Sequence, residues 1–254
     1  MDSQIVGAYP FPYAVIDNVI PEDLLKAALY DAFQALPAPD DPDWVYYHNP
    51  LEEKYALNKR EKFPELIRLL LDGFYDQETM HRFEKLLGVK NLQPDPNLLG
   101  AGIHKIGNGG KLDIHLDHNR NGKLPGLERK VNAIFWFHPE WQDDWGGDLE
   151  LWSEKYGKPH ECAVQISPKP GRLALFKAGD RSFHGHPKPL TCPIDKYRTS
   201  LALYYYSDAL EDTQIREKVH FYNLPGEADS PELVSLREAR ADPKKASSVW
   251  RTKK

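Results

Sequence analysis

Residues 112–118, LDIHLDH, place a histidine and a carboxylate two positions apart. In an extended strand, residues i and i+2 share a face, so His115 and Asp117 project together. Two polar side chains on one face need solvent, each other or a metal ion, because burying them without partners is costly. A surface His–Asp pair explains this motif alone equally well, so the remaining polar motifs must decide.

Two further motifs follow along the chain. DRSFHGHP contains His184 and His186, and YRTSLALYYY places Arg198 at the start of a strand. Two imidazoles and one carboxylate form the facial triad of non-haem Fe(II) oxygenases, which leaves metal positions open for a chelating cosubstrate and oxygen. A guanidinium suits the far carboxylate of such a cosubstrate. Ser200 shares the strand face of Arg198, and Tyr204 follows on that face.

The elements that must position these residues are short strands. Runs of strand length, separated by Gly, Pro, Asn and Asp, occur throughout residues 98–208: LLGAGIHKI, KLDIHLDH, KVNAIFWFH, DLELWS, ECAVQIS, GRLALFKAG and RTSLALYYYS. Seven or eight such runs at close spacing predict an antiparallel sandwich or barrel.

The first 95 residues are predicted to be mainly helical. A short entry strand over 12–20 precedes a helix that opens at Pro21. Residues 63–88 suggest two helices, the second closed by Gly88. The Pro/Asp-rich segment 38–50, which carries the aromatic side chains of Trp44, Tyr46 and Tyr47, is predicted to be a loop.

The composition is that of an ordinary globular protein. The 254 residues are 41% hydrophobic and 28% charged, and the net charge is −5, so nothing global favours nucleic acid or an anionic membrane. We find no apolar run of membrane-spanning length and no signal-peptide pattern at the N-terminus. Two cysteines, Cys162 and Cys192, favour a reduced, cytoplasmic protein, although one disulfide stays open.

Taken together, the motifs resemble the Fe(II)/2-oxoglutarate-dependent dioxygenase superfamily, in its prolyl-4-hydroxylase-like branch. The pattern H-x-D, a distal His and a following Arg reads here as His115-Leu116-Asp117, His184 and Arg198. The resemblance covers roughly residues 12–208 and extends to the segments FPYAVIDNVIPEDLL, IGNGGKLDIHLDHN, VNAIFWFHPEW, WGGDLELW and GRLALFKAGDRSFHGHP.

The resemblance implies an α+β fold: a double-stranded β-helix (jelly-roll) core with N-terminal helices packed on one sheet. We expect residues 1–208 to form a single oxygenase domain, with a helical part over about 1–95 and the core over about 98–208. Residues 209–254 then form a C-terminal extension whose basic tail is expected to be solvated.

It also implies a site. His115, Asp117 and His184 would be the catalytic metal ligands, with Fe(II) as the metal and 2-oxoglutarate as cosubstrate. The cosubstrate would be bound by Arg198, Ser200, Trp136 and Tyr204, with ascorbate as a candidate reductant. Family members oxidise 2-oxoglutarate to succinate and CO2, usually with hydroxylation of a substrate. An aspartate at position 117 favours this outcome over halogenation, which needs a small residue there.

The chain departs from the family at two positions. A Tyr often found about ten residues before the first ligand falls near Lys105, with His104 beside it; a Lys could still meet a carboxylate. The distal ligand is followed by Gly-His, which makes His184 and His186 rival ligands. His184 is preferred because it follows Ser-Phe as the family ligand does, and His186 is left to contact substrate or solvent.

The loop 118–130 directly follows the H-x-D pair, and we expect a lid or a substrate loop there. Asn119, Arg120 and Arg129 could meet an anionic substrate, and Trp44, Tyr46 and Tyr47 could form a second wall.

The predicted activity is hydroxylation of a small molecule (an amino acid, sugar or natural-product intermediate), with O2 consumed and neither nucleic acid nor membrane as a partner. The sequence does not determine the oligomeric state. The alternatives are a protein or peptidyl-proline hydroxylase and, from another class, a metal-binding jelly roll without oxygenase activity. Arg198 argues against the last, since such a protein needs no anchor for a dicarboxylate.

Overall fold

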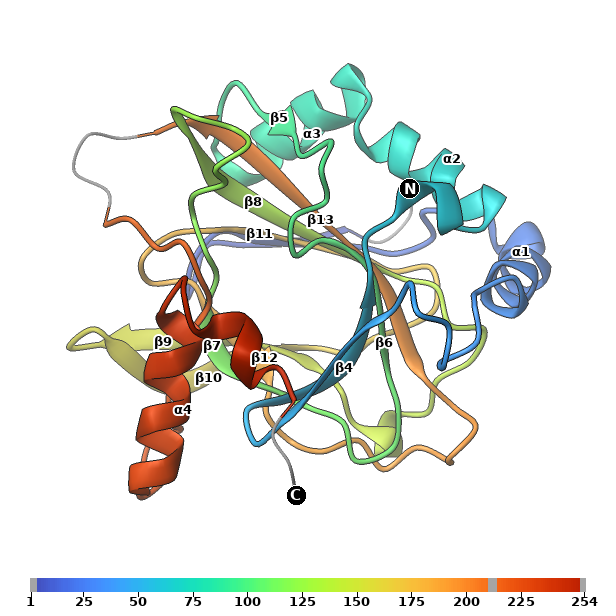
Figure 1. Cartoon of the computed structure of the whole chain (residues 1–254). Coiled ribbons are helices and arrows are strands. Elements are labelled where there is room, and N and C mark those ends of the chain that lie inside the picture. The colour runs from blue at the N-terminus through green and yellow to red at the C-terminus, as the bar shows by residue number, and fades with distance from the viewer. Residues whose placement is uncertain (1–3, 210–213, 252–254) are drawn as a thin grey trace.

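The computed structural model describes residues 4–209 and 214–251, and strands dominate it (Figure 1). The helices are α1 (Glu22–Gln34), α2 (Glu65–Phe74), α3 (Gln77–Leu87) and α4 (Pro231–Ala241), with short 3-10 turns η1 (Arg60–Lys62), η2 (Asp143–Trp145) and η3 (Ala246–Val249). The strands before the core are β1 (Gln4–Gly7), β2 (Tyr13–Ile16), β3 (Val45–Asn49), β4 (Glu52–Leu57) and β5 (Gln93–Pro94). Those that follow are β6 (Gly102–Ile106), β7 (Leu112–Leu116), β8 (Leu127–Trp136), β9 (Leu149–Lys155), β10 (Lys158–Ile166), β11 (Leu173–Lys177), β12 (Phe183–His186), β13 (Arg198–Asp208) and β14 (His220–Phe221).

The strands form one antiparallel sheet that curls into a half-barrel. Its order is β1-β2-β11-β8-β13-β6-β4-β7-β12-β9-β10, so strands distant in sequence become neighbours. In Figure 1 the layer of β8, β11 and β13 lies across from the layer of β7, β9, β10 and β12, with β4 and β6 joining the two. This is the predicted jelly roll.

The two faces of the upper layer have different roles. Along β8, Ala133 and Phe135 are fully buried in the core shared with the helices, whereas Trp136 belongs to a second core inside the barrel. Alternation with period two therefore turns every second residue of β8 and β13 toward the barrel interior. Helices α2 and α3 cover the outer face (Figure 1), as predicted.

The predicted helices in residues 63–88 are confirmed. Helix α2 follows Pro64, which cannot donate to a preceding carbonyl and is tolerated at a helix start. The Asp76 carboxylate accepts from two amides of the first turn of α3, and Gly88 closes that helix with a φ of 63°. Among the described residues, we find no helix that is both long and apolar enough to span a membrane.

The N-terminal part contains more strand than expected. The segment 38–50, predicted to be a loop, contains β3, which forms a hairpin with β4, and β4 pairs with both β6 and β7. The prediction was wrong because β3 and β4 are rich in polar residues, and their strand conformation depends on non-local pairing.

The C-terminal extension is folded against the barrel, and this includes Ala246 and Trp250 of the terminal segment that was expected to be a solvated tail. Arg240 of helix α4 forms an ion pair with the buried carboxylate of Glu52 on β4. Trp250 packs on Tyr47 of β3 with ring centroids 5.1 Å apart. Residues 252–254, the end of the basic tail, lie outside the described residues. The extension therefore forms part of the wall at the barrel mouth.

Candidate metal centre and cosubstrate pocket

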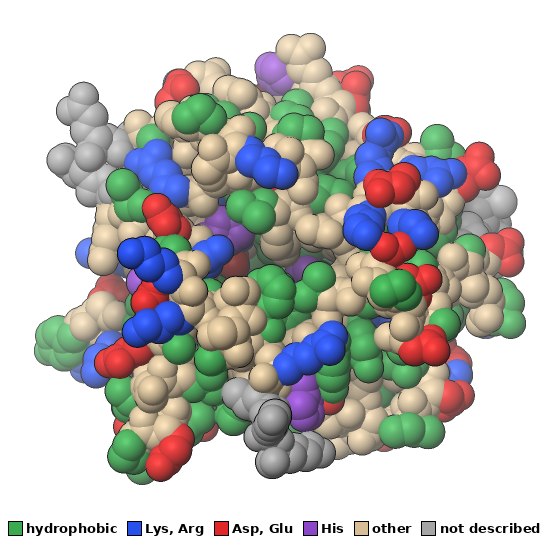
Figure 2. Space-filling view, viewed as in Figure 1, with side chains coloured by type: hydrophobic (Ala, Val, Ile, Leu, Met, Phe, Trp, Pro, Cys, Tyr) green, Lys and Arg blue, Asp and Glu red, His purple; other side chains and the backbone are tan. Residues whose placement is uncertain are grey.

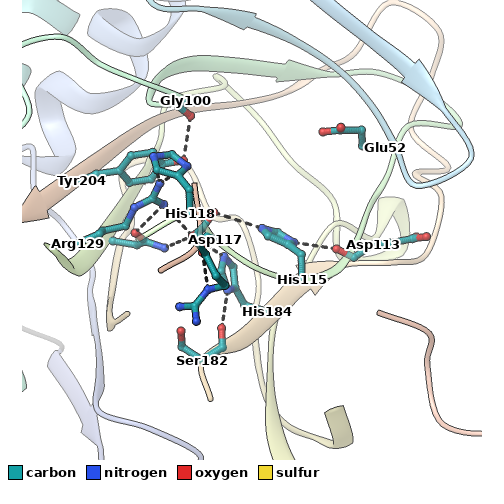
Figure 3. Close-up of polar contacts among 12 residues, drawn as sticks. Glu52, Gly100, Asp113, His115, Asp117, His118, Arg129, Ser182, His184 and Tyr204 are labelled. Atoms are coloured by element: carbon teal, nitrogen blue, oxygen red, sulfur yellow. Dashed lines mark hydrogen bonds and ion pairs between the residues drawn. The ribbon is translucent and has the colours of Figure 1, made fainter. Parts of the chain in front are cut away.

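Three side chains from two neighbouring strands converge inside the barrel. His115 is on β7, Asp117 lies just past its end, and His184 on β12 is the direct pairing partner of His115. One ligand atom from each lies within 4.8 Å of the others. The His115 Nε2–Asp117 Oδ1 distance is 3.7 Å and the His184 Nε2–Asp117 Oδ2 distance is 3.3 Å. Figure 3 shows the three side chains pointing toward one another. Neighbouring ligands of an octahedral metal ion lie about 3 Å apart, so the cluster needs only small adjustments to hold one.

The histidines are held in the tautomer that metal binding needs. Nδ1 of His115 lies 2.8 Å from the carbonyl oxygen of Asp113, and Nδ1 of His184 lies 2.8 Å from that of Ser182. A carbonyl only accepts, so each Nδ1 carries the proton and each Nε2 presents a lone pair to the cluster. Burial lowers the pKa of His115, which keeps the imidazole neutral. The donor set therefore fits Fe(II).

Asp117 is positioned by two side chains of β8. Arg129 Nη1 lies 2.9 Å and Asn132 Nδ2 lies 2.6 Å from Oδ2, and both donate to it (Figure 3). Burial works to raise the pKa of Asp117, but the positive charge of Arg129, with help from His184, holds it well below its usual value. The carboxylate is therefore ionised and oriented before any metal arrives.

A cavity of about 280 Å³ extends from this cluster. Arg198, Ser200 and Tyr204, at alternate positions of β13, all line it, as the sequence predicts. Figure 2 shows the molecule hollowed at this face, with histidine side chains visible in the depth of the hollow. The metal cluster thus shares one cavity with three of the four predicted cosubstrate residues, Arg198, Ser200 and Tyr204.

Arg198 is a buried cation with unused donors. It is 4% exposed, and its Nε donates to the carbonyl oxygen of Gly147 at 2.8 Å. Within residues 4–209 and 214–251, no carboxylate oxygen lies within 4 Å of its guanidinium. Burial lowers the pKa of Arg198 to about 9, against the opposing charge of Asp148, so the group is still protonated near neutral pH. A buried guanidinium of this kind calls for an anionic ligand.

Trp136 and Tyr204 occupy different places. Trp136 is fully buried, is not among the cavity-lining residues, and lies behind Arg198, with the guanidinium 5.3 Å from its ring. Its indole N–H has no hydrogen-bond partner among the described residues. Tyr204 lines the cavity, donates its hydroxyl to the carbonyl oxygen of Gly100 at 2.9 Å, and stacks under Arg129 at 3.6 Å (Figure 3).

Lys105 does not face the cavity. Its ammonium lies 4.2 Å from the ring centroid of Tyr197, and it is the preceding residue, His104, that lines the cavity opposite Ser200. The possibility that Lys105 meets a cosubstrate carboxylate is therefore wrong. The register of β6 decides this, because adjacent residues of a strand face opposite sides.

The lid expected over 118–130 is also not supported. Asn119 is buried and donates to the carbonyl oxygen of Gln214 at 2.7 Å, Arg120 reaches the carbonyl oxygen of Leu127, and Arg129 is 1% exposed behind Asp117. These side chains hold the loop in place and are not presented to an incoming substrate.

Several functional residues were missed by sequence reasoning. Asn132 is one, and a polar residue within the apolar run KVNAIFWF is the signal that could have revealed it. The walls from β4 and the C-terminal extension are others: Lys54, Arg240 and Trp250 all line the cavity. No local pattern announces them, since they come together only through tertiary pairing. Of the second wall expected from Trp44, Tyr46 and Tyr47, only Tyr47 reaches the cavity.

Comparison with known proteins agrees with this geometry. Residues 101–206, which contain the cluster and Arg198, match the family described as the 2OG-Fe(II) oxygenase superfamily. The match assigns residues 101–206 to the 2OG-Fe(II) oxygenase superfamily. The chain is also 37% identical over 68 residues to the Drosophila melanogaster protein named prolyl 3-hydroxylase sudestada1, a match covering 22% of this chain and 12% of that protein.

Two solved structures share the fold of this oxygenase. A prolyl-4-hydroxylase from Pseudomonas putida aligns with a TM-score of 0.53 and 16% identity, covering 78% of this chain and 93% of that one. A prolyl hydroxylase from Trichoplax adhaerens, solved with a hypoxia inducible factor peptide, aligns with a TM-score of 0.51 and 21% identity, covering 76% and 83%. The chain thus shares the jelly-roll fold of these two prolyl hydroxylases.

Proposed function

We propose that this oxygenase binds Fe(II) through His115, Asp117 and His184, anchors 2-oxoglutarate through Arg198, and hydroxylates a small polar molecule. The observation that carries the proposal is the unpaired, buried guanidinium of Arg198 in the same cavity as a preorganised two-histidine, one-carboxylate cluster. A metal-binding jelly roll without oxygenase activity has no use for such a cation.

Each residue has a defined task in this proposal. When bound, Fe(II) with 2-oxoglutarate and O2 would supply the oxidising chemistry: one oxygen atom would go to succinate, formed with CO2, and the other to the hydroxylated substrate. The backbone carbonyls behind the histidines maintain the ligating tautomer, and Arg129 with Asn132 holds Asp117 ionised. Arg198 binds the far carboxylate with its free donors, and the Ser200 hydroxyl adds a hydrogen bond. Trp136 supports Arg198 from behind, and Tyr204 closes the cavity wall.

The substrate class is inferred from the cavity mouth. Aromatic rings of Tyr47, Phe221 and Trp250 frame it beside the charged groups of Lys54 and Arg240. The C-terminal extension forms one side of this opening, and the opening is lined by both aromatic and charged groups. Such a lining suits a small polar compound such as an amino acid or sugar derivative.

The second candidate is a peptidyl-proline hydroxylase. The name of the Drosophila relative, a prolyl 3-hydroxylase, favours it, and that match is confined to a small part of both chains. Succinate release should be measured with panels of free amino acids, sugars and proline-containing peptides. Turnover only with peptides would overturn the small-molecule proposal.

We also propose that residues 1–208 form one oxygenase domain with 209–254 as an appended wall, and that the protein works in a reducing, cytoplasmic setting. Support for the second point comes from Cys162, which is exposed, and Cys192, which is buried, both with free thiols.

The experiment that tests the site needs no substrate. Under anaerobic conditions, Fe(II) followed by 2-oxoglutarate should produce the visible charge-transfer band of the chelate. His184→Ala should abolish the band, and Arg198→Ala should weaken 2-oxoglutarate binding while leaving metal binding intact. A folded wild-type protein without a band would contradict the proposal.

A further inference from the structure

His186 is a buried imidazole that does not belong to the metal cluster. It follows the ligand His184 by two residues on β12, is 4% exposed, and lines the same cavity. Neither ring nitrogen has a hydrogen-bond partner among the residues the structure describes. Leaving such groups unpaired costs free energy, and an orphaned polar side chain aimed into a cavity indicates a missing ligand.

The backbone holds His186 in this position. Gly185 lies so close to β7 that a Cβ there would come within 2.7 Å of the carbonyl oxygen of Leu112. β12 is therefore pressed against β7, with His186 paired to Leu112 after a bulge. The side chain is thus fixed by the strand pairing that also presents the metal ligand.

The surroundings of His186 select the kind of partner. Arg198 is the strongest of the charged groups that act on His186, followed by Lys54, His115 and His104. These four are cationic or imidazole groups, so an anion that accepts the imidazole N–H suits this part of the cavity. His186 therefore shares one cavity with both the metal cluster and the Arg198 guanidinium.

We infer that His186 donates a hydrogen bond to the far carboxylate of 2-oxoglutarate and, with Arg198, selects a dicarboxylate cosubstrate. This inference rests on the proposed function, because it assumes that the cosubstrate spans the cavity from the metal to Arg198. It adds His186 to the residues that bind the cosubstrate, and His186 then contacts the cosubstrate and not solvent.

The test compares two ligands of the Fe(II) protein under anaerobic conditions. The first is 2-oxoglutarate, and the second is 2-oxopentanoate, which has the same five-carbon chain and lacks the far carboxylate. The ratio of the two dissociation constants, read from the chelate band, measures recognition of that carboxylate alone. Metal binding is followed separately with Mn(II), so the readout does not depend on turnover.

In His186→Leu, the preference for 2-oxoglutarate should fall by about tenfold or more, as expected for a lost hydrogen bond to a charged group. The affinity for 2-oxopentanoate should stay within about twofold of wild type. His186→Gln, which keeps a donor, should restore part of the preference. An unchanged preference in both variants would overturn the inference, as would an equal loss of affinity for both ligands, which would place His186 at the metal end.

A stability measurement separates this role from a structural one. Without ligands, His186→Leu should unfold at the same denaturant concentration as wild type or a higher one, because it removes orphaned buried nitrogens. A clear loss of stability with unchanged ligand preference would identify a packing residue. If the wild-type protein forms no chelate band, the proposed function itself is contradicted. If the wild-type protein forms the band and the His186 variants keep its preference for 2-oxoglutarate, only the role inferred for His186 is contradicted.

Discussion

At the residue scale, the contact between Arg129 and Asp117 is the most consequential outside the ligand set. The guanidinium is fully buried and is the main positive charge beside a buried carboxylate. Removing one partner of such a pair leaves an uncompensated charge in a low-dielectric site. The ion pair therefore stabilises the empty site and also shapes it for metal.

Arg129→Met should lower the unfolding free energy of the metal-free protein by about 3–5 kcal/mol. Mn(II) should recover more stability in this variant than in wild type, because the cation replaces the lost charge. Denaturant titrations with and without Mn(II) measure both effects. The matched control is Arg60→Met, which breaks an exposed pair with Asp72 on α2 and should cost about 0–1 kcal/mol. Equal costs for the two variants would show that Asp117 does not depend on Arg129.

A second residue-scale prediction concerns His138, which is buried away from the metal cluster. Its Nε2 lies 2.6 Å from the carbonyl oxygen of Pro168, and its Nδ1 accepts the amide of Thr199. Burial lowers the pKa of His138 to about 3. Below about pH 6.5 the imidazole of His138 binds a proton in the unfolded chain but not in the folded protein. The unfolding free energy therefore falls as the pH drops toward 3.

His138→Phe should therefore flatten the decline of stability between pH 6.5 and pH 4.5 by up to about 1.4 kcal/mol per pH unit. The variant also loses the acceptor for the Thr199 amide, so its stability should be lower at every pH; only the slope tests the prediction. Denaturant midpoints across this pH range provide the slope. His160→Phe, at an exposed position of β10, controls for the loss of one imidazole. A slope identical to wild type in His138→Phe would refute the assignment.

At the element scale, a buried ion pair between Arg240 and Glu52 connects helix α4 to strand β4. Glu52 is 1% exposed and contacts Arg240, with Lys54 as a second, weaker partner at 3.4 Å. Since β4 bridges the two layers of the barrel and α4 supports the mouth, this pair connects the C-terminal extension to the cavity wall (Figure 1).

Arg240→Leu should destabilise the protein by about 3–5 kcal/mol, because Glu52 stays buried with only Lys54 to balance it. The double variant Glu52→Gln/Arg240→Leu should lose less than the sum of the single losses, with a coupling energy of about 0.5–3 kcal/mol. A complete double-mutant cycle by denaturant unfolding measures this. Strictly additive losses would mean that the two elements are held together by other contacts.

At the scale of the whole molecule, one core joins the helices to the barrel. Buried side chains from every N-terminal helix and from the upper layer belong to the same cluster, among them Leu29, Ile67, Phe83, Phe135 and Leu203. Such a shared core couples the elements, and we expect the helices and the barrel to unfold together.

Thermal unfolding followed by tryptophan fluorescence and by far-UV circular dichroism should therefore give coincident transitions. Mn(II) at 100 times its dissociation constant should add about 2.7 kcal/mol of stability, and this gain should disappear in His184→Ala. Two separated transitions would instead show that residues 1–95 form an independent unit. A gain that persists in His184→Ala would mean that the metal binds elsewhere.

The sequence by itself determined how residues close together in the chain lie relative to one another. The two-residue period of a strand put His115 beside Asp117, and it put Ser200 and Tyr204 on the face of Arg198. The helices over 63–88 were equally predictable, because a capping aspartate and a closing glycine act within a few residues. These features depend on backbone geometry that neighbouring residues largely set among themselves.

Only the tertiary structure decided the relationships between distant segments. Strand register turned His104 into the cavity and Lys105 out of it, and the curl of the sheet buried Arg129 behind Asp117. It also made Tyr47 and Trp250, some 200 positions apart, parts of one wall. Pairing of this kind depends on the complementarity of surfaces far apart in the chain, and a one-residue change of register would reverse every side chain on a strand.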